Sequence, residues 1–170
     1  MSELSEFRAA KDAFFQDDPQ SPLTPEQHRS FAGLAYFDER PELALALRPE
    51  PFEQPERIEM QTSTGDHAIY ERWARADFEV DGEPASITIY RDPDGGALFV
   101  PFQDATSGGE SYGAGRYLEP EQAEGGRVIL DFNYAYNPYC AYNERWSCPL
   151  PPAENRLPVP IRAGERSFPG

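Results

Sequence analysis

The chain has 170 residues, a length that a single domain with one hydrophobic core commonly occupies. Thirty acidic residues against 15 basic residues give a formal net charge of −15 at pH 7, which excludes the basic footprint that nucleic acid or an anionic lipid surface requires. No apolar run approaches the roughly 18 residues of a membrane span. We therefore expect one domain over residues 1–170 with neither a nucleic-acid nor a membrane partner.

The first 33 residues predict a helical arm. Within residues 3–16, apolar side chains recur at the i, i+3 and i+4 spacing of one helix face. Thr24-Pro25-Glu26-Gln27 is a capping-box pattern with proline at the first helical position, which predicts a short second helix from Pro25 to about Phe31. The sequence opens without a basic stretch followed by an apolar core, a start that favours a cytoplasmic protein. We expect four aromatic residues of the arm to contact the core or each other: Phe7, Phe14, Phe15 and Phe31.

Residues 34–170 predict an antiparallel β core. The alternation of apolar and charged residues over 70–80 is typical of a half-buried strand. Turn signals at Asp81-Gly82 and at 92–96 connect this strand to 85–91 and 97–102 in a meander. Prolines 49, 51 and 55 predict a bend. The further candidates are 42–47, 56–62, 111–118, 127–134 and an edge strand at 157–163.

About seven or eight short strands follow one another without intervening helices. This order indicates a mainly β fold, an antiparallel β-barrel or sandwich that carries the N-terminal helical arm. A long loop over 135–156 interrupts the strand pattern, and loops of that length are often functional.

Two segments differ chemically from the rest of the chain. They are PFQDATSGGESYGAGRY, residues 101–117, and the stretch 131–155, which begins DFNYAYNPYCAY. With the TSTG turn at 62–65, the KDAFF helix and CPLPPAENRLPVPIRAGE, they resemble the bacterial and archaeal family called domain of unknown function 1684. The resemblance covers nearly the whole chain and implies no activity, so it assigns no catalytic residue.

We hypothesise that these segments form a ligand site. Tyrosine offers an apolar body with a polar tip, and asparagine offers both donors and acceptors, a mixture that suits a concave pocket. The candidate ligand-binding residues are Asp104, Thr106, Ser107, Tyr112, Arg116, Asp131, Asn133, Asn137, Cys140, Tyr142, Asn143, Glu154 and Asn155.

Arg116 has two interpretations. Its planar fork can receive the carboxylate or phosphate of a small ligand, with Tyr112, Asn133 and Asn143 lining the same pocket. Alternatively, Asp104, Asp131 or Glu154 neutralises it internally in a structural ion pair.

Cys140 and Cys148 are the only cysteines. A zinc site uses four nitrogen or sulfur ligands in close pairs, and this spacing does not supply them, so we expect no metal. We also expect no cofactor. Free, buried thiols are the favoured state, although a nine-residue segment could fold back to bond the two sulfurs.

The leading functional hypothesis is a β module that binds a small molecule, possibly an anion. The alternatives are a structural or interaction protein without a pocket, a hydrolase-like enzyme with Asp131, Asp104 or Glu154 as general base, and a flavin-binding split barrel by analogy of fold alone.

Overall fold

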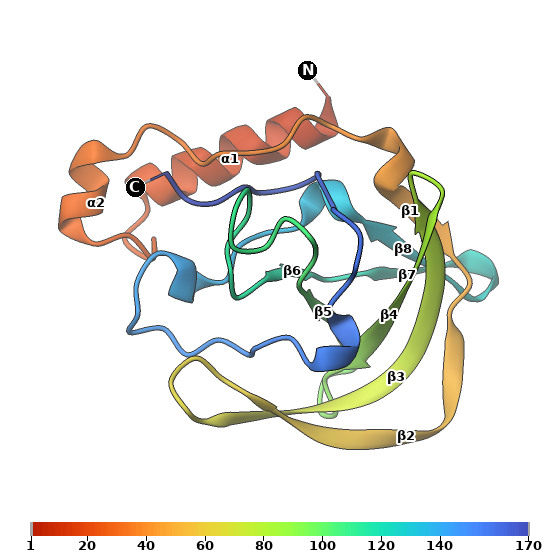
Figure 1. Ribbon diagram of the computed structural model, residues 1–170. Helices are drawn as coiled ribbons and strands as arrows, with labels where there is room; N and C mark the ends of the chain where they lie inside the picture. The colour runs from red at the N-terminus through yellow and green to blue at the C-terminus, as the bar shows by residue number, and fades with distance from the viewer. Residues whose placement is uncertain (1, 170) are drawn as a thin grey trace.

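The computed structural model describes residues 2–169 and has a mainly β architecture with an N-terminal helical arm (Figure 1). Two helices come first, α1 (Glu3–Asp17) and α2 (Pro25–Ser30). Eight strands follow: β1 (Ala44–Leu47), β2 (Glu50–Gln61), β3 (His67–Val80), β4 (Glu83–Arg91), β5 (Leu98–Phe102), β6 (Arg116–Leu118), β7 (Glu121–Ala123) and β8 (Arg127–Asp131). Residues 2–169 also contain five short 3₁₀ turns. They are η1 (Pro41–Leu43) before β1, η2 (Glu124–Gly126) between β7 and β8, and η3 (Phe132–Tyr134), η4 (Tyr139–Ala141) and η5 (Ala153–Asn155) after β8.

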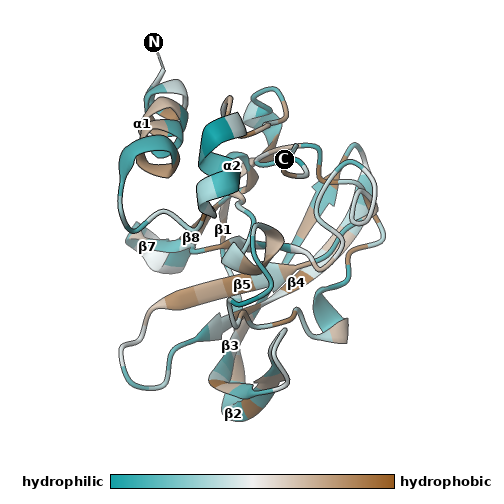
Figure 2. Ribbon diagram, turned by 90° about the vertical axis from the view of Figure 1, so that its left-hand side faces the viewer, coloured by the Kyte–Doolittle hydropathy of each residue, from teal (hydrophilic) through white to brown (hydrophobic). Residues whose placement is uncertain are grey.

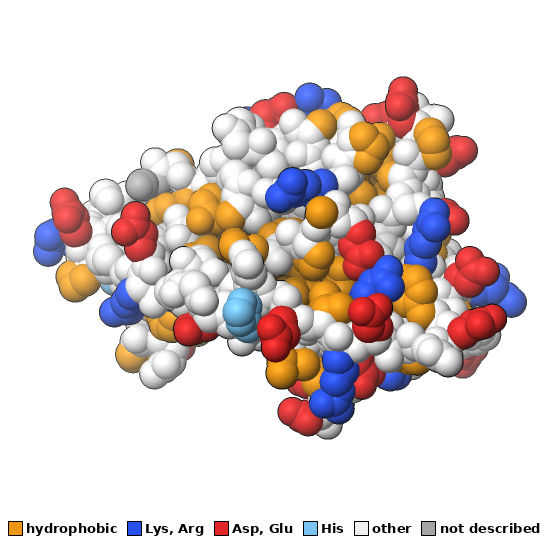
Figure 3. All heavy atoms as spheres, turned by 60° about the horizontal axis from the view of Figure 1, so that its bottom comes forward, with side chains coloured by type: hydrophobic (Ala, Val, Ile, Leu, Met, Phe, Trp, Pro, Cys, Tyr) orange, Lys and Arg blue, Asp and Glu red, His pale blue; other side chains and the backbone are white. Residues whose placement is uncertain are grey.

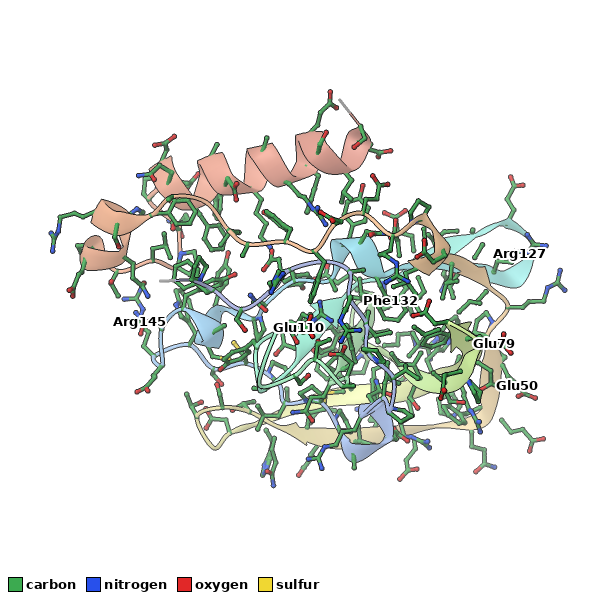
Figure 4. The ribbon with its side chains drawn as sticks, turned by 45° about the horizontal axis from the view of Figure 1, so that its top comes forward. Glu50, Glu79, Glu110, Arg127, Phe132 and Arg145 are labelled. Carbon is green, nitrogen blue, oxygen red and sulfur yellow. The ribbon has the colours of Figure 1, made fainter. Side chains whose placement is uncertain are left out.

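The strands form two antiparallel sheets. One has the order β2-β3-β4-β5-β6 and the other the order β1-β8-β7. The sheets are sandwich-like and do not close into a barrel, so the sandwich is the correct one of the two predicted architectures. The main core lies between them and includes Ile87, Ile89, Leu130 and Phe132. Figure 4 shows Phe132 in the interior, whereas Glu50, Glu79 and Arg127 extend from the outer edge.

The predicted meander is confirmed by the pairing of β3 with β4 and of β4 with β5. Residues 74–80 alternate between buried and exposed as the sequence pattern predicts. Asp81 and Gly82 both have positive φ, 52° and 84°, the backbone that a tight two-residue hairpin turn requires.

Three strand predictions are wrong in extent. The prolines at 51 and 55 lie within β2 instead of ending it, because β2 is an edge strand whose outer side needs no donor and its register shifts between Pro51 and Glu56. Residues 111–115 form turns before β6. The strand predicted over 127–134 ends at Asp131, whose carboxylate accepts the Asn133 N–H and caps η3. Residues 157–163 are not a strand, and β7 was not predicted.

The helical arm packs along the sandwich through a small aromatic cluster. Phe15 is 1% exposed and lies 5.1 Å from Tyr142 and 6.3 Å from Phe31 between ring centroids. Phe7, although 45% exposed, contacts Tyr134 edge to face at 5.0 Å. α2 has no buried residue, and Figure 2 shows it as hydrophilic almost throughout. The arm is therefore held mainly by α1. No helix among residues 2–169 has the length and apolarity to cross a membrane.

Replacing Phe15 by alanine should lower the free energy of unfolding by roughly 3–5 kcal/mol, because the change leaves a cavity among buried rings. Phe7→Ala, on the same helix but 45% exposed, is the matched control and should cost less than about 1 kcal/mol. Urea denaturation followed by circular dichroism measures both. Equal, small effects would show that α1 is not part of the cooperative unit.

Candidate functional site

The predicted site residues fall into separate groups and do not line one pocket. Four of these groups are hydrogen-bond networks that hold backbone segments together. The fifth, around Cys140, adjoins a hollow lined by aromatic side chains.

Arg116 is the centre of the first group and is completely buried. Its Nη1 donates to the carbonyl oxygens of Ala163 at 2.5 Å and Glu165 at 3.0 Å, and its Nη2 donates to the Ile161 carbonyl at 2.8 Å. Nη2 also lies 3.5 Å from Asp104 Oδ1, in an ion pair whose two side chains are fully buried. Burial lowers the pKa of Arg116, and the charge of Asp104 opposes that shift.

The Asp104 carboxylate also accepts hydrogen bonds from the surrounding protein. Its Oδ2 accepts the Ile161 N–H at 2.6 Å, and the hydroxyls of Thr106 and Ser107 donate to the same carboxylate. The anion pocket predicted at Arg116 is therefore wrong, and the internal ion pair is the alternative that the structure contains. The physical reason is that an extended chain segment, not a ligand, presents its carbonyls to the guanidinium.

The second group joins the β1 side of the sandwich. Asn133 accepts the Arg40 N–H through Oδ1 at 2.8 Å and donates through Nδ2 to the Arg40 carbonyl at 2.9 Å. Asp131 Oδ1 accepts both the backbone N–H and the Nδ2 group of Asn133. Both residues act as structural ties and do not meet Arg116.

Glu154 and Asn155 form the third group, on η5. Asn155 is completely buried and bridges two strands, because it bonds both backbone groups of Thr88 and the Pro101 carbonyl. Glu154 receives a two-pronged bond from Arg72 at 2.8 and 3.0 Å and a bond from the Tyr90 hydroxyl. Burial raises the pKa of Glu154, but these donors outweigh burial and lower the pKa below its ordinary value.

A hollow of about 210 Å³ lies beside this ion pair, between Phe52 and Thr88. Figure 3 shows the same side of the molecule as a mosaic, in which hydrophobic side chains are bordered by cationic and acidic ones. The arginines of this hollow are already paired: Arg72 with Glu154, and Arg75 with Asp77 at 3.2 Å. It offers a ligand no free charge.

The fourth group surrounds Glu165, which is 2% exposed. Its carboxylate accepts the Asn137 N–H at 2.9 Å and the Tyr142 hydroxyl at 3.1 Å, and it pairs with Lys11 of α1. Lys11 is the only lysine in the chain. Asn137 also donates to the Arg166 carbonyl at 3.0 Å. These contacts fasten the arm, the long loop and the C-terminal segment to one another.

The fifth group lies next to a hollow of about 360 Å³, which we call the aromatic hollow. Four rings from two distant parts of the chain contribute to its walls, with ring pairs in edge-to-face contact at 5.2 and 5.8 Å. It is lined by Tyr117, Tyr136, Pro138, Tyr139, Trp146, Ser147, Cys148 and Pro149.

The loop wall of the aromatic hollow is fastened to the turn between β2 and β3. Ser63 N–H donates to the Cys148 carbonyl at 3.0 Å, and Cys148 N–H donates to Ser63 Oγ at 3.1 Å. Leu150 N–H reaches the Gln61 carbonyl at 2.7 Å, and the Tyr117 hydroxyl donates to the Pro149 carbonyl at 2.5 Å. The wall is therefore preformed by backbone bonds.

One residue that lines the aromatic hollow carries an unpaired polar atom. The indole Nε1 of Trp146 is buried and has no hydrogen-bond partner among residues 2–169. A buried N–H without an acceptor costs roughly 1–3 kcal/mol, so native proteins usually satisfy it. The predicted residue Asn143 lies nearby in sequence, but its side chain accepts the Arg145 N–H at 3.1 Å and belongs to a turn. In Figure 4 the Arg145 side chain extends outward from this loop.

Both cysteines are free and buried, as the sequence favours. The Cys140 N–H lies 3.3 Å from Cys148 Sγ, and the Tyr112 hydroxyl lies 3.7 Å from Cys140 Sγ. The neighbouring Cys148 thiol first, and then the Tyr112 hydroxyl, lower the pKa of Cys140 to about 6, although burial opposes the shift. The same pairing raises the pKa of Cys148.

Sequence reasoning located this loop but missed the residues that line the hollow. Tyr117 belongs to a segment with a strand-like pattern and Tyr136 to the long loop, and the sequence carries no signal of a shared wall until their backbones bridge. Trp146 and Cys148 stand in the loop that the sequence singled out, and the lone tryptophan among tyrosines was the available signal.

Comparison with known proteins gives one family and one informative structure. A family model described as "Protein of unknown function (DUF1684)" matches residues 29–166. The solution NMR structure of an uncharacterized protein from Haloarcula marismortui is 40% identical, with a TM-score of 0.72 over 96% of this chain and 92% of the other. The search of curated proteins found no match.

Arg116→Leu should destabilise the protein by roughly 3–5 kcal/mol, because it leaves the buried Asp104 carboxylate without its counter-charge and three carbonyls without their donor. Arg162→Leu, which breaks the exposed pair with Glu110, is the matched control and should cost at most about 1 kcal/mol. Thermal and urea denaturation measure the difference. Full stability of Arg116→Leu would contradict the structural role.

Proposed function

We propose that the aromatic hollow binds a small molecule. The chain belongs to the DUF1684 family. The ligand class is a small, planar and largely apolar molecule that carries a hydrogen-bond acceptor. The unpaired indole N–H of Trp146 is the observation that carries this proposal, because it is a buried donor in a wall that otherwise offers ring faces and edges.

The size and lining of the hollow support this ligand class. Small-molecule pockets commonly measure about 300–1,000 Å³ and combine aromatic walls with a few fixed polar groups. At about 360 Å³, the aromatic hollow lies at the small end of that range. The hydroxyls of Tyr117 and Tyr136 already bond Pro149 and Glu119, so these two residues offer a ligand mainly their rings.

The charge pattern favours a neutral molecule. No residue that lines the aromatic hollow carries a formal charge in its ordinary state at pH 7, in a protein with a net charge of −15. An anion would therefore enter against the field of the whole molecule without an arginine to receive it. The ligand proposed for this hollow is therefore neutral, unlike the anion that the sequence suggested.

The carboxylate-dependent hydrolase has less support. Asp104 and Asp131 are hydrogen-bonded to backbone and side-chain donors, and the pKa of Glu154 is lowered by Arg72 and Tyr90 despite its burial. A general base at neutral pH works best with a pKa near 7, so a lowered carboxyl pKa is a disadvantage. A protein without any ligand remains the competing function that the following experiment tests.

The two tryptophans of the chain make the binding test specific. Each gives one indole N–H resonance in a ¹H–¹⁵N spectrum, and Trp73→Phe assigns the remaining one to Trp146. Benzamide, indole-3-carboxamide and coumarin are planar probes with a carbonyl acceptor. We expect them to shift the Trp146 indole resonance in a saturable manner, and toluene, which lacks an acceptor, to shift it less.

Trp146→Phe should weaken binding of the strongest probe about fivefold, the effect of losing one hydrogen bond of about 1 kcal/mol. Trp73→Phe is the control, because Trp73 lies on β3 and packs against the main core instead of the hollow. Failure of all three probes to move the Trp146 resonance, or equal binding by Trp146→Phe, would contradict the proposal.

A further inference from the structure

The two thiols are brought together by the local fold of the loop. Cys140 lies in η4 (Tyr139–Ala141), and the chain returns so that Cys148 Sγ accepts the Cys140 N–H at 3.3 Å. The two cysteines also lie in one packed cluster of buried side chains. The turn at Ser63 holds both backbone groups of Cys148, so the return of the loop is fixed and not accidental.

A hydroxyl donor points to the same sulfur. Tyr112 Oη lies 3.7 Å from Cys140 Sγ. Burial raises the pKa of Tyr112 to about 12, so its phenol keeps the proton that it donates. Donors to a sulfur stabilise the thiolate, which is the nucleophilic form of cysteine.

The aromatic hollow reaches one residue of the pair, Cys148, whereas Cys140 lies behind its wall. Cys148 contributes to its wall, and the side chains of Cys140 and Cys148 are in one packed cluster with Tyr117. The residues are 9% and 7% exposed, which excludes large partners and leaves room only for small ones. Residues 2–169 contain no group of three histidine, cysteine or acidic side chains that could hold a metal, so the pair has no third ligand.

We propose that Cys140 and Cys148 are a redox-active dithiol that a small organic disulfide oxidises to an intramolecular disulfide. The Cys140 thiolate attacks one sulfur of the reagent, whose S–S bond breaks and releases one thiolate that takes a proton from water. Cys148 then loses its proton to solvent, and its sulfur attacks Cys140 and displaces the second thiolate, which is protonated in turn. The two protein thiols are oxidised, and the reagent is reduced to two thiols.

Bis(2-hydroxyethyl) disulfide is a suitable reagent, because it is small and neutral and a protein of charge −15 does not repel it. The folded full-length chain is incubated with it at pH 7, quenched in acid and measured by intact mass. The expected product has lost two hydrogens and carries no reagent, and peptide mapping places the bond between Cys140 and Cys148.

The single-cysteine variants separate the two roles. Cys148→Ser should accumulate a mixed disulfide between Cys140 and the reagent, because no second thiol can displace it. Cys140→Ser should react more slowly. Two unreacted thiols in the folded wild type, or a stable adduct on each cysteine, would overturn the proposal. Faster labelling of Cys140→Ser than of Cys148→Ser would overturn the assignment of Cys140 as the attacking sulfur.

A pH profile tests whether the Tyr112 hydroxyl stabilises the Cys140 thiolate. Tyr112→Phe removes one hydroxyl donor, so the midpoint of reaction rate against pH should move to higher pH and the rate near pH 6.5 should fall several-fold. Tyr134→Phe is the matched control, since Tyr134 packs against Phe7 of the arm, and its profile should be unchanged. An unchanged profile for Tyr112→Phe would contradict activation by that hydroxyl.

The oxidation experiment is read by mass and needs no bound fragment. Failure of the planar probes would therefore leave a positive thiol result standing, and the two proposals can fail separately.

Discussion

The buried guanidinium of Arg116 supplies the C-terminal segment with the hydrogen-bond donors that a neighbouring strand would otherwise supply. An extended chain presents alternate carbonyls to one side, and those of Ile161, Ala163 and Glu165 all point to this one side chain. Asp104 supplies the compensating charge and also binds the Ile161 N–H. A planar group with five donors can satisfy such a row, whereas an ammonium group cannot match its geometry.

The path of the C-terminal segment depends on this arrangement, and other contacts depend on that path in turn. A side chain at Gly164 would place its Cβ 2.7 Å from the Ala135 carbonyl, so only glycine fits where the segment crosses the long loop. The next residue, Glu165, then reaches Lys11, Asn137 and Tyr142. One buried cation thus positions the carboxylate that ties the helical arm to the loop, and the aromatic hollow lies in that loop.

The elements with a clear period were predictable and the irregular ones were not. The capping box at Thr24 and the alternation of 74–80 report local preferences that the tertiary structure reinforces. The segment 157–163 has strand-like composition. The carbonyls of Ile161 and Ala163, however, accept hydrogen bonds from Arg116, which lies more than 40 residues earlier, and no local pattern predicts that contact. The region of the candidate site was predictable from its tyrosines and cysteines, whereas Tyr117 enters its wall only through tertiary pairing with Tyr136.

The polar residues that look most functional in the sequence serve the backbone. An irregular loop lacks the ladder of a sheet, so side chains such as Asn133 and Asn155 must satisfy the backbone groups that a strand would have paired. What these networks leave unpaired is then more informative than what they contain. Among the described residues, four buried side-chain atoms have no hydrogen-bond partner: Nε of Arg8, Nε of Arg116, Oδ1 of Asn137 and Nε1 of Trp146. Of these residues, Trp146 lines the aromatic hollow. The Tyr112 hydroxyl approaches the Cys140 sulfur of the same loop, a contact that holds no backbone segment in place. Packing and backbone satisfaction account for neither feature, and this is the basis on which binding and thiol chemistry are proposed at this loop.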